Sequence, residues 1–568
     1  MVMGCLLVSS NAQTTYYVAA TDEIFTTVIQ DAIDVAKDGD AIVVDPGIYY
    51  EGNIDLKGRA VTIQSKYPSN PAATTIYCMD FFSGFIFGSG ETASTIIDGF
   101  TVIHASFEFG GAFVCTFDDE KTKRGGSPTI RNCVITNNNA ESDGAGLYSD
   151  RECNPVVENC IFMINTSGKT GGAVSVSGGN PVYSNCQFMQ NSSGESGGAV
   201  SIFDGNPLFT NCQFVQNVSG MSGGAISIDK GNPVFSNCLF LKNSTLLWGG
   251  AVYAYHGSPV FQNCVFAGNY ADVGGVFWFD TTEQPQILGC TLIDNMAGSF
   301  VSGVCANSSQ GLTIENSIFW GNVVPSKLDF NTIEITGQIE GTRARIAYCD
   351  IQDYLTTLYY ESSDYTTVEG LMSLNPKFIQ DIAGEYIPDN WHLQKSSPCI
   401  NAGNPNYATV PGEVDIDGED RVMNGRIEIG VDEVEVGIVA KVDIVPGKLI
   451  VPSKGFVLAM IRLPQGYAVK DINAKKILWN NKLAARCVEK CRYNAVAVFD
   501  LDKVSDLLGD VEGKVVVTIS GQLANGMAFA GSDTIQVNHI HWKNWFKRVC
   551  HFACMNRSIC KNPSACKK

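Results

Sequence analysis

Residues 186–211 read CQFMQNSSGESGGAVSIFDGNPLFTN, and residues 212–237 read CQFVQNVSGMSGGAISIDKGNPVFSN. The two stretches align without a gap, so the chain repeats one pattern of Cys, Phe, Asn, Gly and Pro every 26 residues. The cysteines mark this repeat at intervals of 27 and then five times 26 residues: Cys133, Cys160, Cys186, Cys212, Cys238, Cys264 and Cys290. Five residues after each cysteine stands an asparagine: Asn138, Asn165, Asn191, Asn217, Asn243, Asn269 and Asn295. A fixed period of this length indicates a solenoid.

The residue types favour a β solenoid over a helical one. Each unit has short β-branched or aromatic runs, such as residues 173–176 and 181–183, separated by Gly, Asn and Pro. Such runs form short strands, and no unit contains a long stretch of helical period. We therefore predict an all-β chain whose main domain is a right-handed parallel β-helix. Each strand of this fold pairs with its equivalents about 4.8 Å above and below.

Equivalent side chains of such a fold stack in rows along the coil axis. Stacked asparagine amides can hydrogen-bond along their row, and the phenylalanines found two residues after most of the cysteines supply an apolar core. Directly stacked parallel side chains rarely reach the dihedral angle of a disulfide. We therefore expect the repeated cysteines to be reduced, buried and small hydrophobic residues.

Composition bounds the possible partners. The 568 residues include 45% hydrophobic and 17% charged residues, which is typical of folded domains with large cores. The net charge of −19 argues against nucleic acid and against anionic membrane surfaces. No run of about 18 apolar residues occurs, so no transmembrane helix is expected.

The N-terminus has features of an export signal. Residues 2–8 are apolar, and Ser10 and Ala12 place small residues at the −3 and −1 positions of a cleavage site, although a basic start is missing. Residues 1–12 are therefore predicted to be a truncated signal peptide, with a short apolar first strand as the alternative.

Three groups of motifs resemble known families. Residues 29–33 and 46–49 resemble the N-terminal cap of bacterial pectate-lyase-like β-helix proteins, and a helix around residues 24–36 would cover the open end of the solenoid. Gly-Gly-Ala-Val and Phe-x-x-Asn within the repeats are similar to those of chlamydial polymorphic membrane proteins, which act in adhesion. Residues 397–403, with 415–418 and 429–433, resemble the closing segment of choice-of-anchor bacterial β-helix proteins. These resemblances imply fold and export, and say little about activity.

The domain organisation follows from where the repeat ends. We predict the β-helix with its N-terminal cap over residues 13–435. Short strands with turn signals between them predict a small immunoglobulin-like β-sandwich over residues 437–537. Residues 538–568 form a basic, aromatic and Cys-rich tail, with seven Lys or Arg and no Asp or Glu.

Candidate catalytic residues are acidic. Polysaccharide lyases need acidic Ca²⁺ ligands and a base, and glycosidases need two carboxylates about 5 to 10 Å apart. Asp204, Asp229 and Asp280 stand at near-equivalent phases of the repeat, and neighbouring coils would bring Asp204 close to Asp229. The alternative is that these aspartates are solvated corner residues.

Metal and disulfide candidates lie after the repeat. Asp415, Asp417 and Asp420 have the spacing of a Ca²⁺ loop, although position twelve is Arg426 instead of Glu. The alternative is an Asp/Gly turn that closes the solenoid.

The cysteines after the repeat are candidates for disulfides, which export favours. For the tail cysteines the alternative is a metal site with His551. The disulfide candidates are Cys487, Cys491, Cys550, Cys554, Cys560 and Cys566, and the first two are a pair or two free thiols.

These observations predict a secreted or cell-surface protein of a bacterial envelope. The favoured function is binding of a polysaccharide or cell-surface glycan, or adhesion, without catalysis. The alternatives are a polysaccharide lyase or glycoside hydrolase that acts on an acidic polysaccharide, and a structural surface component. No cofactor other than Ca²⁺ and no nucleic-acid partner is expected, and the basic tail is a candidate for envelope attachment.

Overall fold

The structure is a computed structural model. It describes residues 13–20, 27–116, 125–281, 283–308, 311–324, 335–337, 344–354, 358–360, 366–379, 391–408, 410–422, 426–434, 438–451, 454–464, 467–480, 482–509, 511–524 and 528–539. The chain divides into two compact units, residues 1–422 with 426–434 and residues 423–425 with 435–568. The proposed signal peptide and residues 540–568 of the predicted tail lie outside the described residues.

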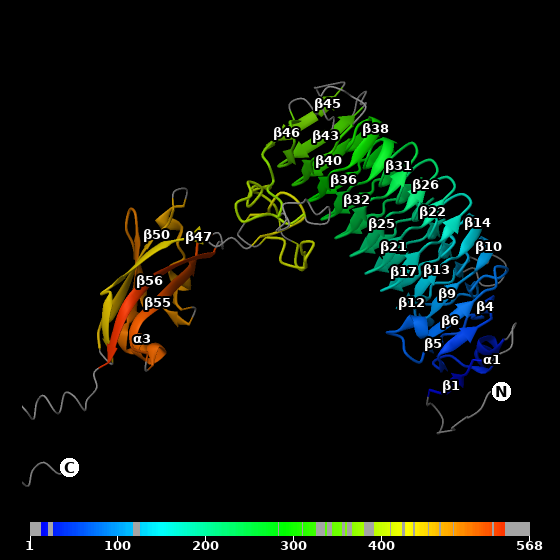
Figure 1. Ribbon diagram of the computed structural model, residues 1–568, viewed down its shortest axis with the longest axis horizontal. Helices are drawn as coiled ribbons and strands as arrows, with labels where there is room; N and C mark the ends of the chain where they lie inside the picture. Colours follow the sequence, from blue (N-terminus) through cyan, green and yellow to red (C-terminus); the bar gives the residue numbers. More distant parts are fainter. Residues whose placement is uncertain are drawn as a thin grey trace, which may run out of the picture. The chain divides into compact units, whose positions relative to one another are not determined.

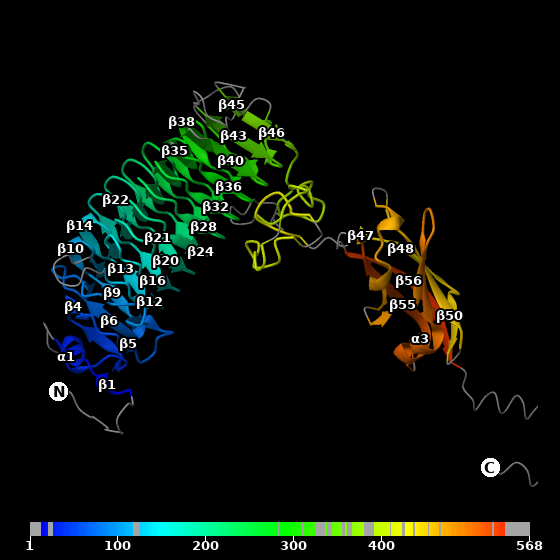
Figure 2. The ribbon, with the colours of Figure 1, turned by 180° about the vertical axis from the view of Figure 1, so that it is seen from behind.

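The first unit is a stack of coils whose strands form four parallel sheets (Figures 1 and 2). Sheet A contains β1 (Thr15–Val18), β2 (Ala41–Val44), β5 (Thr62–Ser65), β8 (Ile96–Asp98), β12 (Thr129–Arg131), β16 (Val156–Glu158), β20 (Val182–Ser184), β24 (Leu208–Thr210), β28 (Val234–Ser236), β32 (Val260–Gln262), β36 (Gln286–Leu288), β40 (Leu312–Glu315), β43 (Ala344–Ala347) and β46 (Thr366–Glu369). Sheet B contains β3 (Gly47–Tyr49), β6 (Thr74–Tyr77), β9 (Thr101–Ile103), β13 (Val134–Thr136), β17 (Ile161–Met163), β21 (Gln187–Met189), β25 (Gln213–Val215), β29 (Leu239–Leu241), β33 (Val265–Ala267), β37 (Thr291–Ile293), β41 (Ile318–Trp320) and β44 (Asp350–Ile351).

Two further sheets belong to the same stack. Sheet C contains β4 (Ile54–Asp55), β7 (Phe85–Phe87), β11 (Phe113–Cys115), β15 (Leu147–Ser149), β19 (Val174–Val176), β23 (Val200–Ile202), β27 (Ile226–Ile228), β31 (Val252–Tyr255), β35 (Phe277–Thr281), β39 (Val304–Ser308), β42 (Ile335–Gly337) and β45 (Leu358–Tyr360). Sheet D is shorter and contains β10 (Ser106–Phe109), β14 (Asn139–Asp143), β18 (Thr166–Ser167), β22 (Ser192–Ser193), β26 (Val218–Ser219), β30 (Ser244–Thr245), β34 (Tyr270–Val273) and β38 (Met296–Phe300).

Each strand pairs with its equivalent one repeat away. Phe188 in β21 lies opposite Phe214 in β25, and Val200 in β23 lies opposite Ile226 in β27, both in parallel pairs. The predicted parallel β-helix is therefore confirmed, and equivalent side chains are stacked along the coil axis.

The repeated asparagines form a buried row. Asn217 donates its side-chain amide to Asn243 Oδ1 (2.9 Å) and to the Phe188 carbonyl (2.9 Å). Its own Oδ1 accepts from the backbone N–H and the side chain of Asn191, both at 3.0 Å. The same pattern runs through the row, and its members are at most 2% exposed: Asn138, Asn165, Asn191, Asn217, Asn243, Asn269, Asn295 and Asn322.

Aromatic stacks and thiols fill the rest of the core. Phe214 stacks on Phe188 and Phe240 with ring centroids 4.9 and 4.7 Å apart. The repeated cysteines are buried free thiols, as expected. Burial raises the pKa of the Cys186 thiol well above its usual range, so this cysteine is held in the neutral form.

The N-terminal end of the stack is covered by α1 (Val28–Val35), which packs against β1, β2 and β4. The Glu51 carboxylate accepts the backbone N–H groups of Ile29 (3.1 Å) and Gln30 (2.8 Å), so it satisfies donors that the first helical turn leaves unpaired. A second short helix in this part of the chain, η1 (Pro71–Ala73), lies between β5 and β6.

Residues 391–434, which we call the cover segment, pack on the outer face of sheet B. Outward positions of this sheet are Gln187 and Gln213 on earlier coils, but become Leu239 and Val265 on later ones. Val265 is fully buried, because the cover segment contributes a small apolar core. That core includes Trp391, Leu393, Cys399, Ile429 and Val431.

A buried arginine joins the cover segment to a coil. Arg421 donates to Asn263 Oδ1 (3.0 Å), to Glu433 Oε1 (2.5 Å) and to the Gly430 carbonyl (2.5 Å). Glu428 beside it is fully buried, and burial together with the carboxylates of Glu433 and Asp432 raises the pKa of Glu428 to about 9.

The second unit contains two sheets around one core. Sheet E contains β47 (Ile438–Val439), β49 (Lys448–Val451), β51 (Leu478–Trp479), β52 (Leu483–Ala484), β55 (Gly513–Gln522) and β56 (Ala528–His539). Sheet F contains β48 (Lys441–Val445), β50 (Phe456–Arg462), β53 (Cys487–Lys490) and β54 (Ala495–Asp500). Buried Trp479 of sheet E meets Phe499 of sheet F edge to face, with centroids 5.3 Å apart. The short helices of this unit are η3 (Val469–Asp471), η4 (Ala474–Lys476) and α3 (Leu501–Leu508).

Loss of one asparagine from the inner row is expected to lower the free energy of unfolding strongly. Asn217→Ala leaves the buried Phe188 carbonyl and the Asn191 amide without their partners, so we expect the free energy of unfolding to fall by about 2 to 4 kcal/mol. Asn206→Ala is the matched control, because Asn206 is stacked in a similar row but is exposed; there we expect a change within about 0.5 kcal/mol. Urea unfolding followed by circular dichroism measures both, and equal effects of the two variants would contradict the role of the inner row.

Buried Glu428 predicts a pH-dependent stability. Its pKa in the folded chain, about 9, is higher than its ordinary value of 4.5, so the folded state keeps a proton that the unfolded state has lost between these pH values. Stability should therefore decline as the pH rises from about 5 to about 9, and Glu428→Gln should flatten this decline. The measurement is the urea midpoint across that range, with exposed Glu419→Gln as the control. An unchanged slope in Glu428→Gln would show that Glu428 does not hold this proton.

Candidate functional site

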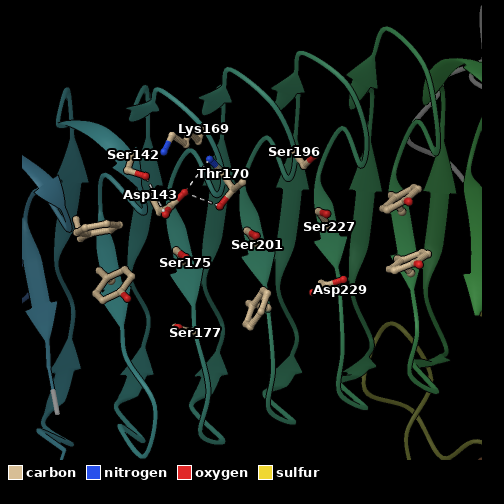
Figure 3. Close-up of a pocket in the computed structure, with 15 residues that line it drawn as sticks. Ser142, Asp143, Lys169, Thr170, Ser175, Ser177, Ser196, Ser201, Ser227 and Asp229 are labelled. Carbon is tan, nitrogen blue, oxygen red and sulfur yellow. Dashed lines mark hydrogen bonds between the residues drawn. The ribbon is translucent and has the colours of Figure 1, made fainter.

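A groove of about 630 Å³ runs along the stack between sheet D and the outer face of sheet C (Figure 3). The residues that line it belong mainly to three columns of equivalent positions. The column at the edge of sheet D contains Asp143, Thr170 and Ser196. The column on the middle of sheet C contains Tyr148, Ser175, Ser201, Ser227 and Tyr253. The column two residues further along each coil contains Ser177, Phe203, Asp229 and Tyr255.

Glycine makes the bend between the two walls. Gly197 follows the sheet D edge and has φ +68°, a conformation that side chains with a Cβ rarely adopt. A Cβ on Gly197 would also lie 2.3 Å from the Val200 carbonyl oxygen. The Gly-Gly pairs of the repeat therefore allow sheet D to turn sharply into sheet C.

The floor of the groove is a row of hydroxyls. Ser175, Ser201 and Ser227 follow one another on neighbouring coils, and Figure 3 shows them in line. Tyr148 and Tyr253 occupy the same column at its two ends, so the floor spans four coil steps, or about 19 Å.

Aromatic rings stand along the same groove. Phe109 lies beside Tyr148 with ring centroids 5.4 Å apart at one end. Phe203 in the middle is 55% exposed, and Tyr255 at the other end is 42% exposed. Lys230 places its ammonium 5.5 Å from the centre of the Phe203 ring. Single exposed rings are common on protein surfaces, but here several rings line one groove.

The wall formed by sheet D carries an aspartate whose carboxylate already accepts hydrogen bonds from neighbouring residues. Asp143 Oδ1 accepts the Thr170 hydroxyl (2.7 Å) and the Thr170 backbone N–H (3.1 Å), and Ser142 donates to Asp143 Oδ2 (3.1 Å). Lys169 lies next to this cluster in Figure 3 and is exposed. The wall therefore combines one carboxylate, one ammonium and several hydroxyls.

The three candidate catalytic aspartates are not assembled into one site. Asp229 lines the groove, and Asp280 has the same position two coils further on, with Tyr255 between them. Asp204 is one residue out of phase: Phe203 occupies the Asp229 position on that coil. Asp204 is exposed and lines a different hollow, with Arg151 and Glu152. Asp204 and Asp229 thus lie on neighbouring coils at near-equivalent positions, one residue out of phase, and they line different hollows.

The spacing of carboxylates within the groove differs from that of glycosidases. Asp143 and Asp229 are on coils three steps apart, which is about 14 Å along the axis. Paired glycosidase carboxylates lie about 5 to 9.5 Å apart. Asp229 and Asp280 are two steps apart, about 9.6 Å, at the upper end of that range.

The predicted Ca²⁺ residues have separate roles. The buried Asp415 carboxylate accepts the backbone N–H groups of Asp417 (2.9 Å), Glu419 (2.8 Å) and Glu433 (3.1 Å), and it therefore closes a turn. Asp420 is exposed and does not join this turn's side-chain cluster.

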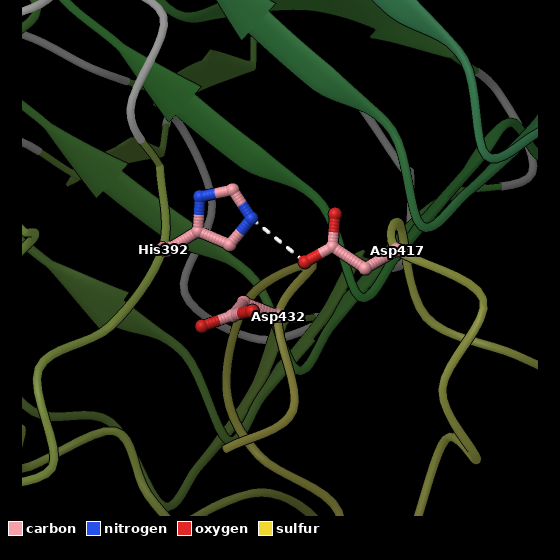
Figure 4. Close-up of side chains that lie close together, drawn as sticks. All are labelled: His392, Asp417 and Asp432. Carbon is pink, nitrogen blue, oxygen red and sulfur yellow. Dashed lines mark hydrogen bonds and ion pairs between the residues drawn. The ribbon is translucent and has the colours of Figure 1, made fainter.

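Asp417 instead lies with His392 and Asp432, two residues that the spacing of the aspartates did not reveal (Figure 4). His392 Nε2 is 2.7 Å from Asp417 Oδ2, and one ligand atom of each residue lies within 4.8 Å of the others. Burial raises the pKa of Asp432 to about 6, against the opposing effects of the Leu393 N–H and of His392.

The cysteine candidates are only partly within the described residues. Cys487 and Cys491 are exposed free thiols, so the structure has the second of the two alternatives for them. Cys550, Cys554, Cys560 and Cys566 lie outside the described residues.

Comparison with known proteins agrees with the fold. The family model described as a right handed beta helix region matches residues 90–214 and 184–338. A search of curated proteins found no match. Among the described residues, no helix is long and apolar enough to cross a membrane. The chain thus contains a right-handed parallel β-helix repeat region, which is compatible with carbohydrate binding, adhesion or action on polysaccharides.

Proposed function

We propose that the groove between sheets C and D binds one extended polysaccharide chain without cleaving it. The observation that carries this proposal is the row of serine hydroxyls along the coil axis, with exposed aromatic rings beside it. The serine row and the exposed rings together indicate a polysaccharide as the ligand class.

The chemistry of the groove suits sugars. A serine hydroxyl both donates and accepts hydrogen bonds, as sugar hydroxyls do, so Ser175, Ser201 and Ser227 can pair with a ligand of either polarity. The rings of Phe203 and Tyr255 offer apolar faces for the C–H surfaces of a sugar ring. Such a combination of apolar faces and a few placed polar groups is typical of ligand sites.

The direction of the groove favours a polymer. Its floor follows the coil axis for about 19 Å, and the same hydroxyl recurs at each coil step. A repeating row recognises a repeating ligand, whereas a small molecule would contact only one or two coils.

We further propose that the protein works outside the cell or on the surface of a bacterial envelope, as a binding or adhesion protein. The apolar residues 2–8 and the resemblance to chlamydial adhesion proteins and choice-of-anchor proteins support this location. In this proposal the second unit is an immunoglobulin-like β-sandwich that spaces the β-helix from its attachment point. The basic tail, residues 538–568, would contact an anionic envelope polymer.

A glycoside hydrolase is the second candidate, because Asp229 and Asp280 are about 9.6 Å apart along the axis. The exposed ring of Tyr255 stands at the same position of the coil between them, where the bond to be cleaved would have to lie. This arrangement favours binding over hydrolysis.

The groove predicts which aromatic residues matter for binding. Phe203→Ala and Tyr255→Ala should each weaken binding of a retained polysaccharide by about 5- to 150-fold, since each removes about 1 to 3 kcal/mol of ring contact. Phe81→Ala is the control, because Phe81 is 76% exposed but lies outside the groove. Affinity electrophoresis against a panel of plant, algal and microbial polysaccharides provides the measurement.

The same panel separates the alternatives. Retention without release of reducing ends or unsaturated products supports the proposal. Release of products that is lost in Asp229→Asn or Asp280→Asn would replace it with hydrolysis, and retention of no polysaccharide would leave the structural surface component as the better account.

A further inference from the structure

The cover segment gathers an imidazole and two carboxylates at one place. His392 follows Trp391 of its small apolar core, Asp417 belongs to the turn closed by Asp415, and Asp432 follows buried Val431. These three stretches are separated by 25 and 15 residues in the sequence, so only the folded cover segment brings them together.

The three ligand atoms are close enough for one ion. They all lie within 4.8 Å of one another, and the closest pair, His392 Nε2 and Asp417 Oδ2, is 2.7 Å apart. Ligands at about 2.0 to 2.1 Å from a tetrahedral ion are about 3.3 Å from each other. To bind one ion, the atoms of the closest pair would move apart by about 0.6 Å, and the more distant ligand atoms would move closer together. Rotation of the side chains is sufficient for both changes.

Asp432 is the most buried of the three side chains. Its side chain is only 5% exposed, and within the described part of the chain its sole hydrogen bond is from the Leu393 N–H to Oδ2 (2.7 Å). One carboxylate oxygen of Asp432 lies within 4.8 Å of a ligand atom of His392 and of a ligand atom of Asp417. Burial of a carboxylate is costly unless it is paired or coordinates a metal, and an ion bound at this cluster would offset that cost.

The surroundings hold two of the ligands in place. The Leu393 N–H orients the Asp432 carboxylate, and Asp415 holds the backbone of Asp417 on one side and of Glu433 on the other. Side chains that orient metal ligands in this way contribute to metal affinity. His392 and Asp417 are about one third and one half exposed, which leaves the opposite side of the cluster open to water.

We propose that His392, Asp417 and Asp432 bind one divalent ion of the Zn²⁺ class, with water completing its coordination. The imidazole ligand distinguishes this site from an all-oxygen Ca²⁺ or Mg²⁺ site. The ion joins three stretches of the cover segment and so fastens it over sheet B. This site is independent of the proposed polysaccharide groove.

The test uses the full chain, stripped with a chelator and titrated with Zn²⁺. Cysteines beyond residue 540 are a second possible set of Zn²⁺ ligands, so the quantity measured is the difference in bound equivalents between the wild type and a variant. We expect His392→Gln and Asp417→Asn each to bind one equivalent fewer than the wild type. His392→Gln keeps a donor for Asp417, and Asp420→Asn, in the same turn, serves as the matched control with unchanged stoichiometry.

Thermal unfolding supplies a second readout. Zn²⁺ at about a hundredfold excess over its dissociation constant should raise the midpoint of the wild type and of Asp420→Asn by at least about 2 °C, but not that of His392→Gln. Metal-free His392→Gln should unfold close to the metal-free wild type, which shows that it folds. Equal Zn²⁺ stoichiometry in the wild type and His392→Gln, or a tighter response to Ca²⁺ than to Zn²⁺, would overturn the proposal.

Discussion

The structure depends on the hydrogen bonds that link each inner asparagine to the asparagine of the next coil. Asn217 binds Asn243 on one side and Asn191 on the other, and it also holds the Phe188 carbonyl. A slip of one residue would break all of these bonds and would turn the inner side chains outward. The row therefore fixes the register of the coils that it links, from Asn138 to Asn322, and the outer columns of those coils follow from that register.

The groove arises where the repeat is regular in some columns and irregular in others. Ser175, Ser201 and Ser227 repeat the same side chain, while the neighbouring column changes from Phe203 to Asp229 to Tyr255. Core columns also vary, as from Val157 to Tyr183 to Phe209, but their side chains stay buried and pack on each other. Exchange between a charged and an aromatic side chain is seen in this outward column, and specificity for a ligand can be built there without disturbing the coils.

The sequence predicts the coils well because their contacts are periodic. The spacing of the cysteines and of Asn217 with its equivalents is enough to place the core rows. The gapless alignment of the coils also gives the phase of outward residues: Phe203 aligns with Asp229, and Asp204 aligns with Lys230. The contacts of His392, Asp417 and Asp432 have no period at all, since they depend on how an unrepeated segment packs on sheet B.

The cover segment also explains which face of the solenoid is free to bind. On later coils the outward residues of sheet B are apolar, and Val265 is fully buried under the segment. The cover segment also occupies the neighbouring turn at Gln262 and Asn263. These two residues are hydrogen-bonded to Glu413, to the Val414 carbonyl and to Arg421. Sheet C keeps hydroxyls and exposed rings at the equivalent outward positions. The groove beside sheet D is thus a surface that the chain itself leaves open from coil to coil.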